Sequence, residues 1–125
     1  YRRAGFAYEL AGGNWISPDD GRFVYRGNWA LSSELSTFGH LYTGENATME
    51  FEFSGTRFAI FSRKSPDYES FEVIIDGEPV GTANLRADKG ATAVVWLSEA
   101  LKDGTHTVII RSKTKFNIDS VVLWQ

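Results

Sequence analysis

Apolar and polar residues alternate along the middle of this chain in the pattern of half-buried β-strands. Every second residue is apolar between positions 49 and 53, and the alternation returns at 57–62 and 71–75. Side chains of a strand point to opposite faces in turn, so a period of two buries one face. Ser54-Gly55-Thr56 and Asp76-Gly77 are tight-turn sequences. The segment predicts three successive antiparallel strands that form the core.

The rest of the chain carries shorter segments of the same kind. Strands are expected at residues 3–9, 22–25, 39–43, 80–85, 92–97, 106–111 and 116–124. Turn residues separate these segments, and none has the period of a convincing helix. About ten short strands divided by turns are typical of a β-sandwich or jelly roll and not of a βαβ sheet.

Strand parity predicts where the connections lie, because alternate connections of an antiparallel chain meet at opposite ends of a sandwich. Three compact turns share one end: 54–56, 76–79 and 98–104. Four connections rich in polar residues share the other: 44–46, 63–70, 86–90 and 112–115. Functional residues concentrate on loops held by a rigid scaffold, so the second end is the expected place for a loop site.

Some apolar residues are expected on the outer faces of their strands. If Ile60 faces the core, Phe61 faces away from it. The same count places three further residues outward: Ile74, Trp96 and Ile109. An outer apolar stripe needs a cover or a ligand. Either the N-terminal segment or the region of Trp29 packs over it, or it is a concave platform on which a sugar ring stacks.

Composition narrows the class of partner. The 125 residues suit one domain, residues 1–125, that buries a core without cross-links, and the chain has no cysteine for a disulfide or a zinc–thiolate site. A net charge of -3 argues against nucleic acid or an anionic membrane as partner. No apolar run reaches the roughly 20 residues that cross a bilayer. Without an initiator methionine or signal peptide, the chain is expected to be a module of a longer polypeptide.

Several motifs occur in a characteristic order. They are YRGNW at 25–29, His40, FEFSGT at 51–56, VIIDG at 73–77, LKDGTHTV at 101–108 and IDSV at 118–121. Their order and spacing resemble the galactose-binding-domain-like jelly rolls, from about Asp19 to the C-terminus. Such domains occur as carbohydrate-binding modules beside glycoside hydrolases, before the catalytic domain of some SGNH-type carbohydrate esterases, and in phage tail and adhesion proteins. The resemblance implies an all-β, two-sheet antiparallel jelly-roll sandwich.

The resemblance also bears on metal binding. Asp119 is expected where the last strand bulges, its carboxylate accepting nearby backbone N–H groups. Some relatives bind a structural calcium through acidic residues near both chain ends. The carboxylates available here are those of Glu9, Asp19, Asp20 and Asp119. The N-terminal acidic pattern of those relatives is not clearly present, so no cofactor is expected, and calcium is the lesser alternative.

Motifs for catalysis are missing from the sequence. It has no Gly-x-Ser-x-Gly elbow, His-Glu-x-x-His helix or phosphate loop. His106 is expected to be a structural hydrogen-bonder, and His40 is either structural or a polar ligand contact. Asp67 and Glu69 share one short loop, whereas a glycosidase pair opposes its carboxyls across a cleft. We therefore expect no enzymatic activity.

Residues for sugar binding are present at the predicted loop end. A sugar site combines an aromatic face with planar polar groups for hydroxyls. The candidates are Tyr42, Arg63, Asp67, Tyr68 and Arg86 at the loop end, and Trp96 on a sheet face. The alternative is a solvated loop whose arginine and aspartate pair weakly. Trp29 and Trp124 are interpreted as core or edge packing.

The sequence therefore predicts an extracellular, non-catalytic module that attaches a larger enzyme or virion protein to a polysaccharide or cell-surface glycan. Its partners would be that glycan and the other domains of its parent protein. Two alternatives stay open. One is a structural or protein-interaction sandwich without a sugar site, and the other is an ancillary domain that completes the active site of an attached esterase.

Overall fold

A computed structural model describes residues 12–32, 36–39 and 41–125. Its regular elements are ten strands: β1 (Asn14–Ile16), β2 (Val24–Ser32), β3 (Leu41–Gly55), β4 (Arg57–Lys64), β5 (Ser70–Ile75), β6 (Glu78–Asn84), β7 (Ala91–Leu97), β8 (Gly104–Ser112), β9 (Phe116–Ile118) and β10 (Ser120–Trp124). The strand predicted at residues 3–9 lies outside the described residues. No helix of the part described is long and apolar enough to span a membrane.

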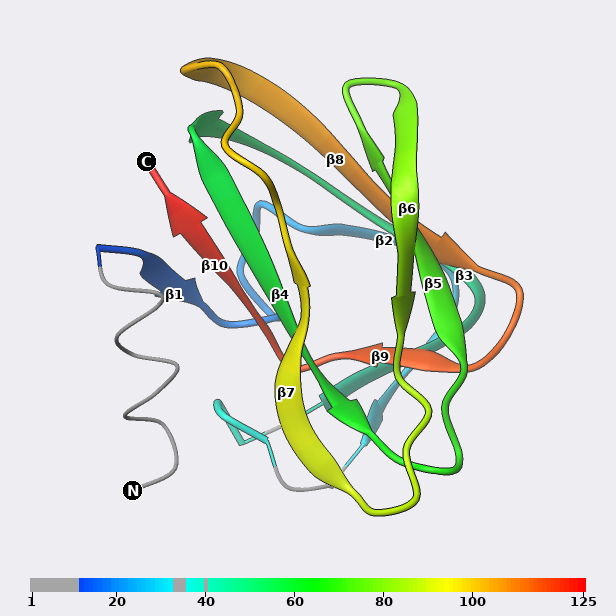
Figure 1. The fold of residues 1–125 in the computed structure, drawn as a ribbon. Coiled ribbons are helices and arrows are strands. Elements are labelled where there is room, and N and C mark those ends of the chain that lie inside the picture. The colour runs from blue at the N-terminus through cyan, green and yellow to red at the C-terminus, as the bar shows by residue number, and fades with distance from the viewer. Residues whose placement is uncertain (1–11, 33–35, 40) are drawn as a thin grey trace.

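The strands form two antiparallel sheets, which confirms the predicted jelly-roll sandwich (Figure 1). The four-stranded sheet has the order β1-β10-β4-β7. The six-stranded sheet has the order β2-β3-β8-β5-β6, with β9 paired to β3. The Asp76-Gly77 hairpin joins β5 to β6 as predicted. However, β3 and β4 do not pair with each other, because the turn after Gly55 carries the chain from one sheet to the other.

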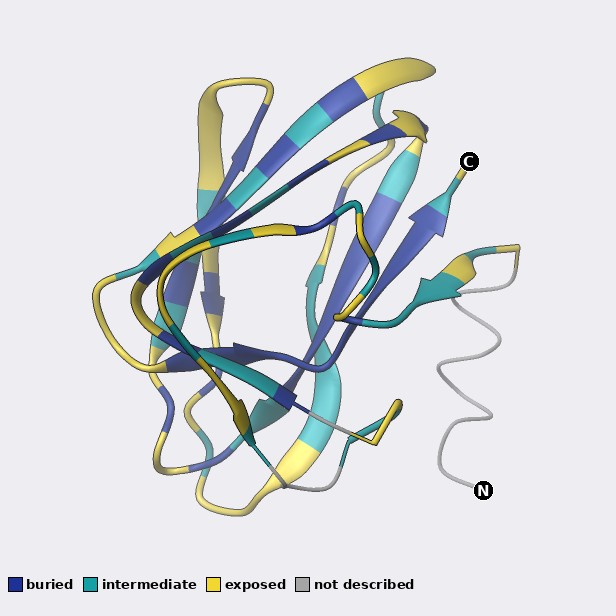
Figure 2. Ribbon diagram, turned by 180° about the vertical axis from the view of Figure 1, so that it is seen from behind, coloured by how far each residue is buried: buried dark blue, intermediate teal, exposed yellow. Residues whose placement is uncertain are grey.

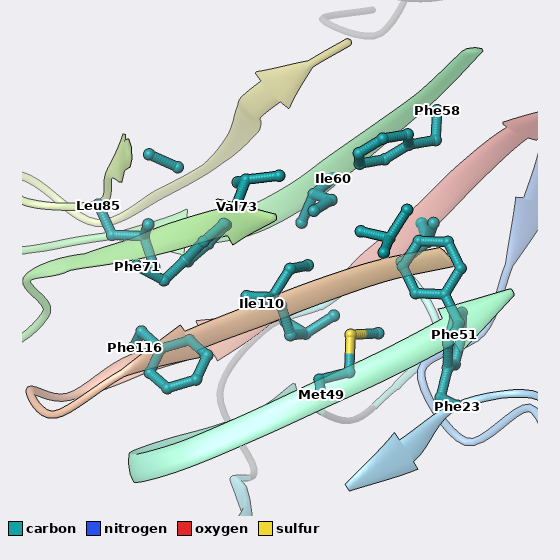
Figure 3. Close-up of a cluster of buried hydrophobic side chains, with 14 of the residues drawn as sticks. Phe23, Met49, Phe51, Phe58, Ile60, Phe71, Val73, Leu85, Ile110 and Phe116 are labelled. Atoms are coloured by element: carbon teal, nitrogen blue, oxygen red, sulfur yellow. The ribbon is translucent and has the colours of Figure 1, made fainter. Parts of the chain in front are cut away.

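The core lies between the sheets and follows the predicted alternation (Figure 3). On β3, Met49, Phe51 and Phe53 are buried, with Glu52 exposed between the two phenylalanines. Phe58 and Ile60 of β4 meet them from the opposite sheet. Phe51 packs edge-on against Phe58, with ring centroids 5.9 Å apart. Burying these large side chains is the main stabilising contribution to the fold.

A second, smaller cluster covers the outer face of the four-stranded sheet. Ala59, Phe61 and Val122 are buried there under Trp15 and Trp124. The rings of Trp15 and Phe61 are 4.6 Å apart. The N-terminal segment therefore covers Phe61, one of the two covers that the sequence allowed. Trp29 lies elsewhere, in β2, where its indole N–H donates to the carbonyl oxygens of Arg26 and Thr48 at 2.9 and 3.0 Å.

The prediction that Trp96 points outward is wrong. The register of β4 against β7 shifts between Ile60 and Phe61, so Trp96 lies opposite Ile60 and Val94 lies opposite Phe61. One extra residue in a strand reverses the face of every residue beyond it. Trp96 consequently packs against the main core from inside. Ile74 and Ile109 do lie opposite each other, outside both core clusters, as the count predicted.

The turn predicted at residues 44–46 is also wrong. Those residues lie within β3, which continues from Leu41 to Gly55. Gly27 pairs with Ala47 whereas Asn28 pairs with Glu45, which leaves Asn46 as the extra residue of a β-bulge. Asn46 has a φ of 51°, a conformation that asparagine adopts more readily than most residues. Gly44-Glu45-Asn46, which the sequence suggested as a turn, therefore forms a bulge within β3 and does not end the strand.

Candidate functional site

The predicted loop end exists. The backbone N–H of Glu69 donates to the carbonyl oxygen of Lys115 at 2.8 Å, and that of Leu85 donates to the carbonyl of Glu69 at 2.9 Å. Ser65 and Arg86 form an isolated β-bridge. The connections 63–70, 86–90 and 112–115 therefore meet at one end of the sandwich, as strand parity requires.

Tyr68, the aromatic candidate of this end, belongs to the core. Its side chain is among the largest that are fully buried, with a relative exposure of 1%. The ammonium of Lys115 lies 5.5 Å from the ring centroid on the outer side. A sugar ring cannot stack on a face that is already packed, and a ligand contact at Tyr68 stays a prediction.

Of the polar candidates at the loop end, Arg86 has its side chain in an ion pair, whereas Arg63 and Asp67 are held through backbone hydrogen bonds. The Arg86 guanidinium donates to the Glu69 carboxylate at 2.5 Å. The backbone of Arg63 is held on both sides by the Asn117 amide, with N···Oδ1 and O···Nδ2 distances of 2.8 Å. Asp67 is exposed, and its N–H donates to the Ser65 hydroxyl at 3.2 Å. Arg63, Asp67 and Arg86 thus share one end of the sandwich. The guanidinium of Arg86 is already paired with the Glu69 carboxylate.

Tyr42 lies in an aromatic group on β2 and β3. Its ring stacks on Tyr25 with centroids 4.8 Å apart and an angle of 24° between planes. Tyr25 also meets the Trp29 ring, and its hydroxyl donates to the carbonyl oxygen of Pro18. Burial, followed by the charges of Tyr42 and Asp19, raises the pKa of Tyr25 above its ordinary value. One face of Tyr42 is therefore used for packing.

Trp96 lines a slot between the two sheets. The slot lies between β6 and the segment that follows β7. The slot has a volume of about 480 Å³. Its other lining residues are Ile75, Val80, Leu97, Ser98, Glu99, Ala100 and Leu101. The indole nitrogen is buried and has no hydrogen-bond partner among the described residues. Trp96 is thus separate from the loop candidates. It also does not lie on the outer sheet face, where the sequence predicted a platform for a sugar ring.

A hollow lies on the outer face of the six-stranded sheet, and the sequence did not predict its residues. It has a volume of about 610 Å³. Residues at matching register form one row across five strands: Arg26, Thr48, Arg111, Glu72 and Thr82. Thr48 and Glu72 lie between buried neighbours, and the other three residues of the row are exposed, so the row belongs to the outer face of the sheet. Figure 2 shows the alternation of buried and exposed residues along these strands. The Asn46 bulge and the β8–β9 connection, through Ser112 and Lys113, complete the rim.

Ion pairs orient the charged groups of this row. Arg111 donates through Nε to Glu72 Oε1 at 2.8 Å. Arg26 donates through Nη1 to Glu50 Oε1 at 3.4 Å. Guanidinium, carboxylate and hydroxyl groups on adjacent strands are spaced for the hydroxyls of an extended polar ligand. The next row along the sheet contains the Ile74–Ile109 pair, in which Ile74 is buried and Ile109 is half-buried.

Two of the carboxylates considered for calcium, those of Asp20 and Asp119, accept hydrogen bonds from the chain. Asp119 is buried, and its oxygens accept the Thr37 N–H and the Ser120 hydroxyl, each at 2.9 Å. Asp119 lies at the break between β9 and β10 and accepts a backbone N–H as expected, but that N–H belongs to Thr37 and not to a neighbour in the sequence. Asp20 accepts from the N–H and guanidinium of Arg22. Within the described ranges no three His, Cys, Asp or Glu residues form a metal-binding group. Glu9 and His40 lie outside those ranges, and calcium stays a prediction.

His106 is structural, as expected. Its ring nitrogens contact Asp76 Oδ2 at 2.6 Å and the carbonyl of Lys102 at 2.5 Å. The hydrogen bond to Asp76, followed by that to Lys102, raises the pKa of His106 above its ordinary 6.5. The hydrogen bonds from His106 and from the Thr107 N–H lower the pKa of Asp76 below 3.8. The pair ties the β5–β6 turn to the start of β8.

These two shifts predict how stability depends on pH. The His106 contribution is complete below pH 6.5 and is lost as the pH rises through the raised pKa. The Asp76 contribution is complete above pH 3.8 and is lost as the pH falls through the lowered pKa. We expect the melting temperature to fall from pH 6 to pH 9, and to fall less in Asp76→Asn. Asp88→Asn, at an exposed carboxylate, should keep the full decline; an unchanged slope in Asp76→Asn would contradict the pairing.

Comparison with known proteins places the fold in a carbohydrate-active context. Residues 39–125 match the family model described as carbohydrate esterase 2 N-terminal. No curated protein sequence matches the chain. A family 35 carbohydrate-binding module from an environmental isolate superposes with a TM-score of 0.67 at 19% identity, covering 87% of this chain and 91% of that one.

Two larger enzymes contain the same fold as a part. An exo-β-1,3-galactanase from Phanerochaete chrysosporium superposes with a TM-score of 0.70 at 14% identity, covering 90% of this chain and 29% of that chain. A family two carbohydrate esterase from Cellvibrio japonicus gives 0.63 at 17% identity, covering 89% and 33%. This chain therefore spans about a third of either enzyme. At such identities the superpositions establish the jelly-roll fold.

Proposed function

Because the chain belongs to the family of N-terminal domains of family 2 carbohydrate esterases, we propose that it is a non-catalytic carbohydrate-binding domain. It would hold a larger carbohydrate-active enzyme on an extracellular polysaccharide. Family membership makes it a carbohydrate-associated ancillary domain, and binding itself is the proposed step. Modest affinity at one site is sufficient, because attachment raises the local concentration of the enzyme on its polymeric substrate.

The observation that carries the proposal is the hollow on the six-stranded sheet. Its row from Arg26 to Thr82 runs across five strands, so it is long enough for several sugar units. Polar side chains of this row can bond sugar hydroxyls, while the half-buried Ile109 in the next row offers an apolar contact to C–H groups. This supports the sheet-face alternative of the sequence-based hypothesis over the loop-end alternative.

Blocking the hollow tests the proposal. Thr48 lies in the middle of the row, and Thr48→Tyr fills the space with an outward side chain that a β-strand tolerates. Thr105→Tyr is the matched control, since Thr105 is exposed on β8 of the same sheet and does not line the hollow. In affinity electrophoresis through gels that contain plant and bacterial polysaccharides, we expect Thr48→Tyr to abolish the retardation seen with the unaltered protein and with Thr105→Tyr.

Two other outcomes would change the conclusion. Equal retardation of all three proteins would place binding elsewhere, and the contacts predicted at Arg63, Asp67 and Arg86 would then be examined with Arg86→Ala. No retardation in any gel would favour a structural or protein-interaction domain. The family match also favours a second candidate, a domain that completes the active site of an attached esterase. In that case Thr48→Tyr or a loop variant would lower kcat on a small soluble acetyl ester.

A further inference from the structure

The charge of the hollow differs from that of the protein. Three cationic side chains line it, those of Arg26, Arg111 and Lys113, against the lining carboxylate of Glu72 and the adjacent carboxylate of Glu50, which pairs with Arg26. The chain as a whole carries a net charge of -3. A cationic depression on an acidic protein concentrates anions at that place and not over the whole surface.

The arginine donors are also available in a suitable geometry. The ion pair with Glu72 uses only Nε of Arg111, and its two terminal nitrogens have no partner among the described residues. Arg26 likewise engages Glu50 through Nη1 alone. A guanidinium held through one edge presents its remaining N–H groups as a fork, which matches the two oxygens of a carboxylate.

The hollow lacks the usual means of recognising a neutral sugar. Among the described residues that line it, Phe71 is the single aromatic one, and that side chain is 1% exposed. Without an exposed ring, the affinity for a neutral glycan rests on hydroxyl contacts, which compete with water and give little net free energy. Carboxylate groups on the ligand would instead form charge-assisted hydrogen bonds, which are about twice as strong as neutral ones.

From this geometry we infer that the hollow binds an acidic polysaccharide, with Arg111 and Arg26 contacting the carboxylates of uronate units and Lys113 adding charge at the rim. The inference rests on the proposed function and specifies its ligand class. Arg111 is the central contact, because it lies in the middle strand of the row, with Glu72 fixing its orientation. Spacing between strands of about 4.8 Å places successive donors along a chain laid across the sheet.

A matched pair of ligands tests the ligand class by titration calorimetry. The probes are hexagalacturonate and the same oligosaccharide after reduction of its carboxyl groups to alcohols. We expect the carboxylated probe to bind at least about tenfold more tightly at low salt, and to lose most of this advantage at high salt because exposed charges are screened. Arg111→Gln should weaken the carboxylated probe about tenfold and leave the reduced probe nearly unchanged. Lys102→Gln, which removes one positive charge outside the hollow, should change neither.

The outcomes separate the inference from the proposed function. Equal affinity for both probes, abolished for both by Thr48→Tyr, would overturn the acidic ligand while keeping a sugar-binding hollow. Binding of neither probe, together with no retardation in any polysaccharide gel, would overturn both. Polyglutamate of similar length is the charge control. If it binds as tightly as hexagalacturonate, the hollow recognises charge and not a glycan, and the inference fails.

Discussion

Tyr68→Ala is expected to lower the free energy of unfolding by about 3 to 5 kcal/mol, the usual loss when a large buried aromatic side chain is truncated. Tyr68 has a relative exposure of 1% at the base of the loop end. Its removal takes packing from the core and leaves Lys115 without the ring that its ammonium covers. Urea denaturation followed by tryptophan fluorescence measures the change in midpoint at constant slope.

The same substitution separates the two roles that the sequence allowed for this residue. Tyr68→Phe keeps the ring and is the conservative control, for which we expect less than half of the loss. If Tyr68→Ala kept its unfolding midpoint but lost polysaccharide binding, the ring would be a ligand platform and its placement in the core would be wrong. A loss of both in proportion would mean only that the domain unfolds.

The sequence predicted the strands well because burial in a sandwich enforces alternation. Met49, Phe51 and Phe53 could be assigned to the core since a half-buried strand has a period of two. The errors came where a bulge interrupts that period. Gly44-Glu45-Asn46 reads equally as a turn or as a bulge, because both use residues that tolerate positive φ. The bulge in β7 reversed the assignment of Trp96 for the same reason.

The candidate site was only partly predictable. The parity of the strands correctly predicted that residues 63–70 and 86–90 lie at one end of the sandwich, because this prediction depends only on the direction of each strand. Burial of Tyr68 within a polar loop depends on tertiary packing, which a single sequence does not reveal. The hollow needs the spatial order β2-β3-β8-β5-β6. Arg26 and Arg111 lie in one row only because strands far apart in sequence are neighbours, a relation that local patterns do not encode.

Gly27→Ala is expected to have the second large effect, and it links the fold to the hollow. Gly27 has a φ of 93°, which costs an L-residue roughly 1–2 kcal/mol. A Cβ at this position would also lie 2.5 Å from the carbonyl oxygen of Asn46 and 2.8 Å from the Cα of Ala47, both backbone atoms of the bulge. Since backbone cannot move aside as a side chain does, β2 must shift away from β3. We expect a total loss of about 3 kcal/mol or more.

Gly39→Ala is the matched control for this prediction. Gly39 has nearly the same φ, 91°, but an added Cβ there would meet no atom of the described residues within 4 Å. The control therefore reports backbone strain alone, and the difference between the two unfolding free energies reports the contact at the bulge. Gly27→Ala should also weaken polysaccharide retardation under conditions where it stays folded, because Gly27 and Asn46 line the hollow. Equal losses in both variants would show that β2 and β3 are not in close contact at this bulge, and retardation kept at full strength would show that the ligand binds away from it.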